Sequence, residues 1–340
     1  MSVTAHLRRR FGALIFDKGL SGVSYLGKLH PRAQPQRHGV EVHRNVPYQA
    51  SGHHHHLLDI YVPRSLPDDL APGRDPATYT APHPVVLYIH GGAFRILSKD
   101  THWVMALAFA RRGFLVFSIN YRLAPRHPFP AALEDAAAAL QYVCQNAAAY
   151  QGDLSRLVFA GESAGANLVT ALSLMTLLSS PAEGQPFAKQ VFDLGVVPRV
   201  VLPMCGILQV SDAARFARRR ALPLWIQDRL HETSDAYIGK VAEHPAIALA
   251  DPLCILERFA ESDSRLPTSR QPPAYFASVG TRDPLLDDTR RLGRALSRLG
   301  IPHQTRFYED EVHAFQALVF RHRAKQAWAD TYAFLDQYLR

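Results

Sequence analysis

Short apolar runs of strand length recur along this chain, and segments of helix length separate them. Such an alternation predicts helices packed on a largely parallel β-sheet, which is the α/β class. Most of the runs are apolar throughout, as expected for strands covered on both faces. The predicted strands are residues 57–62, 85–90, 114–121, 156–160, 197–207, 274–279 and 303–308.

The clearest predicted helix covers residues 130–150, because Pro130 falls in its first turn and Glu134 and Asp135 follow closely. Two stretches interrupt the alternation. Residues 1–40 precede the first predicted strand, and the arginine-rich residues 209–268 form an insertion between two strands. We interpret both as segments added over one end of the sheet, and residues 41–208 and 269–340 as the main domain. Residues 63–84 form a Pro-rich connector.

The composition excludes several classes of protein. With 47% hydrophobic and 20% charged residues among 340, the chain is neither disordered, collagen-like nor a coiled coil. The net charge is +8, from 38 Lys and Arg against 30 Asp and Glu, but the basic residues are scattered. We therefore expect no nucleic-acid partner.

No apolar segment approaches the roughly 20 residues of a membrane span. The apolar run at residues 11–16 is too short for a secretory signal. Three dispersed cysteines, Cys144, Cys205 and Cys254, form neither a disulfide framework nor a metal clamp. These features favour a cytoplasmic location. Residues 5–20 are predicted to form an amphipathic helix on the body of the protein, with a membrane-surface helix as the alternative.

The sharpest motif is Gly-Glu-Ser-Ala-Gly at residues 161–165. It follows a predicted strand and opens a helical run at residues 167–178, which is the context of a nucleophile elbow. The turn is tight, so the flanking positions Gly161 and Gly165 must be small. Because the positive end of the helix dipole points at Ser163, developing negative charge is favoured there.

A second motif, His-Gly-Gly-Ala-Phe at residues 90–94, ends the strand predicted at 85–90. Acyl transfer needs N–H donors aimed at the developing oxyanion, and such a glycine-rich loop exposes its backbone amides. The expected donors are the amides of Gly91, Gly92 and Ala93, together with Ala164 after the serine. A tight strand-to-helix turn is the structural alternative.

A serine hydroxyl needs a neighbouring base, which a third group orients. In α/β-hydrolases the chain order is serine, acid, histidine. The best candidates are Asp283 and His313, each directly after a predicted strand and so at the same sheet edge as Ser163. The rival acids Asp287 and Asp288 fall within the next predicted helix, and the rival His303 begins its strand at the opposite edge.

The four histidines His53 to His56 precede the strand at residues 57–62. Consecutive strand side chains point to opposite faces, which argues against a metal site there. Aromatic residues near the oxyanion loop and in the insertion suggest a substrate pocket, with ordinary core as the alternative. The predicted substrate-binding residues are Phe94, Trp103 and Trp225.

Taken together, these motifs resemble the hormone-sensitive-lipase-like branch of α/β-hydrolase esterases. The matching segments are HGGAF (90–94), NYRLAP (120–125), FPAALED (129–135), GESAGAN (161–167), DPLLDD (283–288) and VHAF (312–315). Asn120 and Arg126 replace the acids that the family usually carries in its DYRLAPE segment, and Glu162 replaces the usual Asp of the elbow.

The resemblance implies an α/β-hydrolase fold with an eight-stranded, mostly parallel sheet, flanking helices and a helical cap formed by residues 1–40 and 209–268. It implies a cofactor-free and metal-free serine carboxylesterase acting on short-to-medium acyl esters through an acyl-enzyme, with Ser163, Asp283 and His313 as the triad. A homodimer would fit the family. The alternatives are an amidase or lactonase using the same triad, and a non-catalytic small-molecule receptor on the same fold.

Overall fold

The computed structural model describes residues 22, 27, 28, 30, 33–64, 82–179, 185–239, 241, 243–262 and 265–340. The helix predicted at residues 5–20, with most of the N-terminal cap segment, lies outside the described residues. The same is true of residues 65–81 in the predicted connector.

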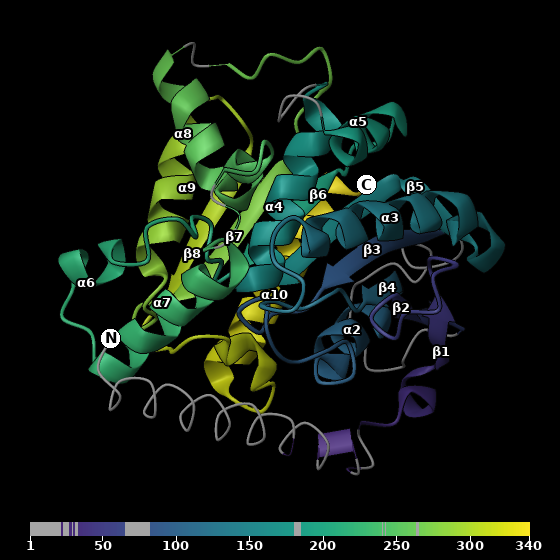
Figure 1. Cartoon of the computed structure of the whole chain (residues 1–340). Coiled ribbons are helices and arrows are strands. Elements are labelled where there is room, and N and C mark those ends of the chain that lie inside the picture. The colour runs from purple at the N-terminus through teal and green to yellow at the C-terminus, as the bar shows by residue number, and fades with distance from the viewer. Residues whose placement is uncertain are drawn as a thin grey trace.

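The centre of the molecule is an eight-stranded sheet in the order β1-β2-β4-β3-β5-β6-β7-β8 (Figure 1). The strands β3 to β8 run parallel, while β2 pairs antiparallel with both β1 and β4. This confirms the α/β class and the mostly parallel sheet. The strands are β1 (Val40–Pro47), β2 (Leu57–Pro63), β3 (His83–Ile89), β4 (Leu115–Ile119), β5 (Gly152–Glu162), β6 (Val200–Met204), β7 (Ala274–Gly280) and β8 (His303–Tyr308).

The first strand was not among the strands predicted from apolar runs, which placed the first at residue 57. β1 lies at the edge of the sheet, and only Val40 is buried along its length. A register shift between His43 and Val46 also interrupts its pairing. An edge strand with one neighbouring strand needs few apolar side chains, so its sequence lacks the apolar run that predicts a buried strand.

The run predicted as a strand at residues 197–207 is wrong at both ends, because β6 covers only Val200–Met204. Cys205 has a φ of 40°, which turns the chain out of the sheet directly after the strand. The apolar residues that follow are buried in the core without being part of the sheet.

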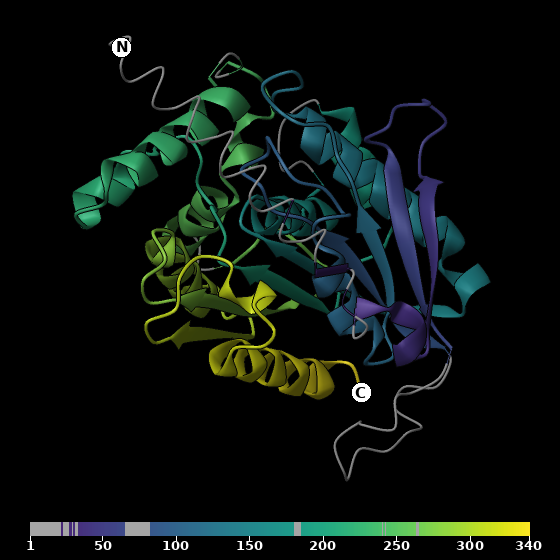
Figure 2. The ribbon, with the colours of Figure 1, turned by 90° about the horizontal axis from the view of Figure 1, so that it is seen from below.

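Helices cover both faces of the sheet. The cluster that includes α2 and α10 packs on one face, and the cluster that includes α3, α4, α5, α8 and α9 packs on the other. In Figure 2, α10 (yellow) runs along one side of the molecule. The helices are α2 (Trp103–Ala110), α3 (Ala131–Asn146), α4 (Ala164–Leu177), α5 (Pro186–Asp193), α6 (Arg215–Arg219), α7 (Leu224–Tyr237), α8 (Pro252–Ser262), α9 (Leu286–Arg298) and α10 (His322–Tyr338), with 3-10 turns at Pro35–His38, Ala147–Tyr150, Ile247–Ala250 and Phe315–Ala317.

Strand β3 shows why its run is apolar throughout. Val85, Leu87 and Ile89 belong to the core on one face, while Val86 and Tyr88 belong to the core on the other. Successive side chains of a strand point in opposite directions, so a strand covered on both faces needs apolar residues at every position. Along the described part of the chain, no helix is long and apolar enough to cross a bilayer.

The insertion between β6 and β7 contains α6, α7 and α8, and a buried ion pair ties its start to the main domain. The Asp288 carboxylate on α9 accepts hydrogen bonds from Arg215 Nη2 at 2.6 Å and from the Leu208 amide at 2.8 Å. Burial raises the pKa of Asp288, although the neighbouring Arg215 opposes that shift. Asp288 therefore holds the start of the insertion against α9.

We predict that Asp288→Ala lowers the free energy of unfolding by about 3 to 5 kcal/mol, because it leaves the Arg215 guanidinium buried without its partner. Urea denaturation of both proteins measures the difference. Glu41→Ala serves as the control, since it removes the exposed ion pair with Arg64 and should change stability little. Equal stability of Asp288→Ala and the parent would contradict the anchoring role.

Candidate active site

Ser163 occupies the turn between β5 and α4. Its φ of 55° and ψ of −111° are unusual for a residue with a side chain, and such backbone strain is typical of functional sites. The structure gives a steric reason for both glycines of the motif. A Cβ at Gly165 would lie 2.0 Å from the Ile89 carbonyl oxygen, and one at Gly161 would lie 2.4 Å from the Gly165 carbonyl oxygen.

Helix α4 begins at Ala164, three residues earlier than the predicted start at 167. The amides of a helix's first turn have no carbonyl partner within the helix, and the Ala164 amide beside Ser163 belongs to that turn. The partial positive charge of the helix N-terminus adds to the attraction for an anion at this point.

The loop after β3 approaches Ser163 closely. A Cβ at Gly91 would lie 3.3 Å from Ser163 Cβ and 2.9 Å from the Glu162 carbonyl oxygen, so a side chain at this position would clash. Gly92 and Ala93 have φ values of 114° and 55°. The absence of a side chain at Gly91 thus allows the predicted oxyanion loop to lie against the predicted nucleophile.

The segment of residues 120–125 holds the loop after β3 in place through contacts with His90 and Phe94. Tyr121 donates a hydrogen bond from its hydroxyl to the His90 carbonyl at 3.1 Å, and its ring stacks on the His90 ring at 4.3 Å. The Ala124 amide donates to the Phe94 carbonyl at 2.8 Å. Both ends of the loop are therefore fixed by one neighbouring segment.

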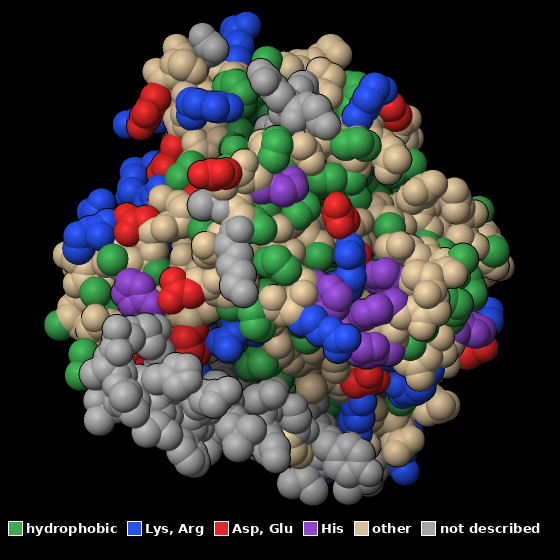
Figure 3. Space-filling model, in the orientation of Figure 1, with side chains coloured by type: hydrophobic (Ala, Val, Ile, Leu, Met, Phe, Trp, Pro, Cys, Tyr) green, Lys and Arg blue, Asp and Glu red, His purple; other side chains and the backbone are tan. Residues whose placement is uncertain are grey.

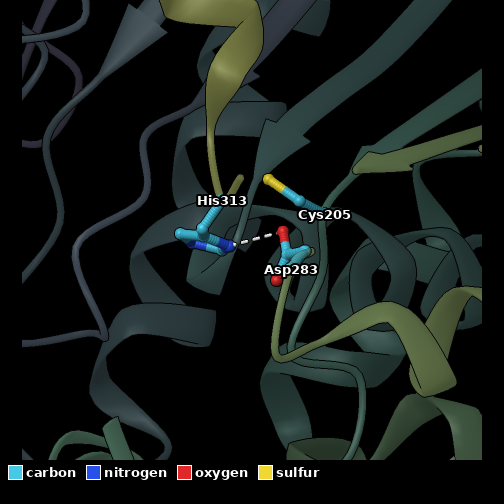
Figure 4. A group of neighbouring side chains, drawn as sticks. All are labelled: Cys205, Asp283 and His313. Atoms are coloured by element: carbon cyan, nitrogen blue, oxygen red, sulfur yellow. Dashed lines mark hydrogen bonds and ion pairs between the residues drawn. The ribbon is translucent and has the colours of Figure 1, made fainter. Parts of the chain in front are cut away.

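Asp283 and His313 form a direct pair (Figure 4). His313 Nδ1 lies 2.8 Å from Asp283 Oδ2, and Asp283 Oδ1 accepts a hydrogen bond from the Leu285 amide at 2.8 Å. An ionised carboxylate only accepts, so Nδ1 is the donor and Nε2 is left as the basic nitrogen. The Asp283 side chain is fully buried, whereas that of His313 is 34% exposed.

Two opposing effects act on the pKa of His313. Burial disfavours the imidazolium and lowers the pKa, but the charge of Asp283 and its hydrogen bond outweigh burial, with a further upward effect from the neighbouring Cys205. The net result raises the pKa of His313 well above its usual 6.5.

Backbone contacts link the strand ends that carry these residues. The Ser163 amide donates to the Met204 carbonyl at 2.9 Å, and the Cys205 amide donates to the Ser278 carbonyl at 2.7 Å. A Cβ at Gly280 would lie 2.1 Å from the Glu311 carbonyl oxygen, so glycine lets the loops after β7 and β8 approach each other. The rival His303 begins β8 at the opposite edge, as predicted, and its ring lies beside Ser297.

Sequence reasoning assigned no role to Cys205, which lies beside the Asp283–His313 pair (Figure 4). One ligating atom of each of the three residues falls within 4.8 Å of the others. A single cysteine at the end of an apolar run gives no local signal of this position. Only the turn after β6 and the closeness of β7 bring its side chain here.

Glu162, whose role the sequence left open, pairs with a buried histidine. Its Oε1 atom lies 3.1 Å from His102 Nε2, and both side chains are buried. His102 immediately precedes α2, so this contact connects the elbow to the helix on the other face of the sheet. The position of Arg126, also left open, is exposed.

The three predicted substrate-binding aromatics lie in different environments. Phe94 is fully buried and stacks on Tyr237 with ring centroids 3.7 Å apart, a partner that the sequence did not indicate. Trp103 is the half-buried first residue of α2, and Trp225 on α7 is 58% exposed. Phe94, which directly follows the oxyanion loop, is the one of the three with an evident connection to the site.

The histidine run lies in a turn before β2, so the argument from alternating strand side chains was wrong. The rings of His53, His54, His55 and His56 contact one another, and His127 joins them. His56 Nε2 also lies 3.1 Å from the buried Asp135 carboxylate. Figure 3 shows histidine side chains gathered on one face of the molecule.

A model of the α/β hydrolase fold family matches residues 86–317, which contain the elbow, the loop after β3 and the Asp283–His313 pair. The chain belongs to the α/β-hydrolase family. The matched family and its esterase relatives place it on the hormone-sensitive-lipase-like esterase branch, as the motifs predicted.

Two curated relatives come from Mycobacterium tuberculosis. The chain is 31% identical to esterase LipI over 75% of its own length and 69% of that protein, and 32% identical to carboxylesterase NlhH over 68% and 66%. These alignments span about two thirds of each relative. Among solved structures, esterase LipW from Mycobacterium marinum has a TM-score of 0.71 at 24% identity, covering 96% of this chain and 90% of that one. An esterase from Pyrobaculum calidifontis has a TM-score of 0.70 at 20% identity, covering 96% and 92%.

We predict that the His313 imidazole titrates above pH 6.5 in the free protein and that Asp283→Asn lowers its pKa, because the neutral amide no longer stabilises the imidazolium. The measurement is a pH series of histidine NMR signals, with His313→Gln assigning the signal among the 17 histidines. An unchanged midpoint in Asp283→Asn would contradict control of His313 by this carboxylate.

Proposed function

We propose that the protein is a serine carboxylesterase that hydrolyses short-to-medium acyl esters through an acyl-enzyme on Ser163. The protein is a carboxylic ester hydrolase. The observation that carries the proposed mechanism is the Asp283–His313 hydrogen bond, formed at the same sheet edge as the strained Ser163 turn.

In the acylation step, His313 Nε2 accepts the Ser163 hydroxyl proton while Ser163 Oγ attacks the ester carbonyl. Asp283 holds the ring through Nδ1 and stabilises the imidazolium that forms. Backbone amides of Gly91, Gly92 and Ala93, with that of Ala164, donate to the tetrahedral oxyanion. His313 then gives its proton to the departing alcohol oxygen.

Deacylation repeats the sequence with water as the nucleophile. His313 takes a proton from the water as it attacks the acyl carbonyl, and returns it to Ser163 Oγ when the carboxylic acid leaves. Every proton in this cycle moves through one imidazole nitrogen. These steps use only groups of the chain and water.

The proposed preference for short-to-medium acyl chains rests on the interpretation of residues 209–268 as a cap. Two contacts support that interpretation. Tyr237, at the end of α7, stacks on Phe94, and its carbonyl accepts a hydrogen bond from the Phe129 amide at 2.8 Å. This brings the insertion against the residue that follows the oxyanion loop. A cap in contact with this loop restricts the length of chain that an acyl pocket admits.

We also propose a cytoplasmic location and a homodimer. The location is supported by the three cysteines, all of which are free thiols, since a reducing compartment preserves that state. The homodimer rests on the likeness to the family alone, and β1 and β8 are the sheet edges that such a dimer would extend.

We predict that Ser163→Ala lowers kcat for p-nitrophenyl butyrate by about 10⁴-fold or more, because it removes the nucleophile. Circular dichroism and thermal unfolding serve as the control that the variant folds. The exposed Ser211 provides a matched substitution, Ser211→Ala, which should keep the parent rate. Hydrolysis by Ser163→Ala at a rate close to that of the parent would refute the assignment.

We predict that kcat/KM peaks between acetyl and hexanoyl esters in a p-nitrophenyl series from acetyl to palmitoyl. Phe94→Ala should move the optimum toward longer chains, because it removes the ring that Tyr237 packs against next to the oxyanion loop. Assays of the parent and variant across the series measure the shift. A palmitoyl optimum in the parent would contradict the proposed cap.

A further inference from the structure

The pair that orients the proposed base has a third potential metal ligand beside it. Cys205 Sγ, an Asp283 carboxylate oxygen and a His313 ring nitrogen lie within 4.8 Å of one another (Figure 4). Across the described residues, this is the one place where three side chains of metal-ligating type converge so closely. A thiol, an imidazole and a carboxylate are the three ligand types that zinc binds in proteins.

We propose that Cys205, Asp283 and His313 form an inhibitory site for a thiophilic divalent cation of the zinc class. Inhibition by the cation depends on the proposed role of His313 as the base. Binding of the cation to the three side chains does not depend on that role. The reaction scheme above assigns no step to Cys205, so its thiol is available as a ligand without being needed for turnover.

The geometry requires only small side-chain movements. Zinc bonds of roughly 2.0 to 2.3 Å in a tetrahedral site hold neighbouring ligand atoms about 3.5 Å apart. His313 Nδ1 and Asp283 Oδ2 are now 2.8 Å apart, joined by a proton. The ion takes the place of that proton, with water in the fourth position. The partly exposed His313 side chain offers the route of entry to a site whose other two ligands are buried.

Binding changes the protonation of two ligands. Zinc binds the thiolate form of cysteine, so the Cys205 thiol releases its proton to solvent when the ion binds. His313 Nδ1 gives up its proton because it now holds the metal, and Nε2 carries a proton. With Nε2 protonated, His313 has no lone pair to accept the Ser163 proton, and hydrolysis stops.

The test compares full-length parent, Cys205→Ala and Cys254→Ala in p-nitrophenyl butyrate hydrolysis during titration with zinc chloride. Cys254 is the matched control, since it is a half-buried thiol on α8. We expect micromolar zinc to inhibit the parent and Cys254→Ala, with recovery in EDTA. Cys205→Ala should keep most of its uninhibited rate and need at least tenfold more zinc. Magnesium should have no effect, because it does not favour thiolate ligands.

A binding measurement separates this site from the proposed reaction. Cadmium titration of Ser163→Ala should produce an ultraviolet absorption band from thiolate-to-cadmium charge transfer, and the band should saturate at one ion per chain. The double variant Ser163→Ala/Cys205→Ala should lack this band. A band that persists in the double variant, or equal zinc sensitivity of parent and Cys205→Ala, would overturn the proposal. So would cadmium binding at Cys205 without inhibition of the parent. Zinc bound by the surface histidines would still bind to Cys205→Ala. Inhibition through those histidines would be equal in the parent and in Cys205→Ala, so it would not produce the expected difference in zinc sensitivity.

Discussion

The site depends on the close approach of three backbone segments around Ser163. The end of β3, the end of β5 and the first turn of α4 meet so tightly that a single added carbon at Gly165 would lie 2.0 Å from a carbonyl oxygen. This packing holds Ser163 in a strained conformation and presses the loop after β3 against it. Burial of α4 against both β5 and β6 supplies the favourable free energy that maintains the strain.

The loops after β7 and β8 complete the site from the other side. Gly280 allows them to approach, and the hydrogen bond between Asp283 and His313 then fixes the imidazole. Asp283 is fully buried and receives a backbone amide as well, so its own position is determined by two independent contacts. A rigid carboxylate of this kind keeps the ring in one orientation and one tautomer through the proton transfers proposed for it.

Most residues of the candidate site were predictable because each lies in a short motif directly after a strand. The order of strands in the sheet was not needed for that step. The site residues that the sequence did not indicate owe their positions to contacts between distant parts of the chain. Cys205 reaches His313 only through the turn after β6, and Tyr237 reaches Phe94 only through the path of the insertion. β1 escaped prediction for a different reason, since an exposed edge strand carries almost no apolar pattern.

Two contacts described above fasten the insertion to the main domain. Arg215 binds Asp288 of α9 near the start, and Tyr237 packs on Phe94 farther along. Neither partner belongs to the insertion itself. A chimaera that receives residues 209–268 from another enzyme would therefore inherit only half of each attachment. Exchange of specificity between relatives by grafting this segment therefore requires that residues 94 and 288 of the recipient match the graft.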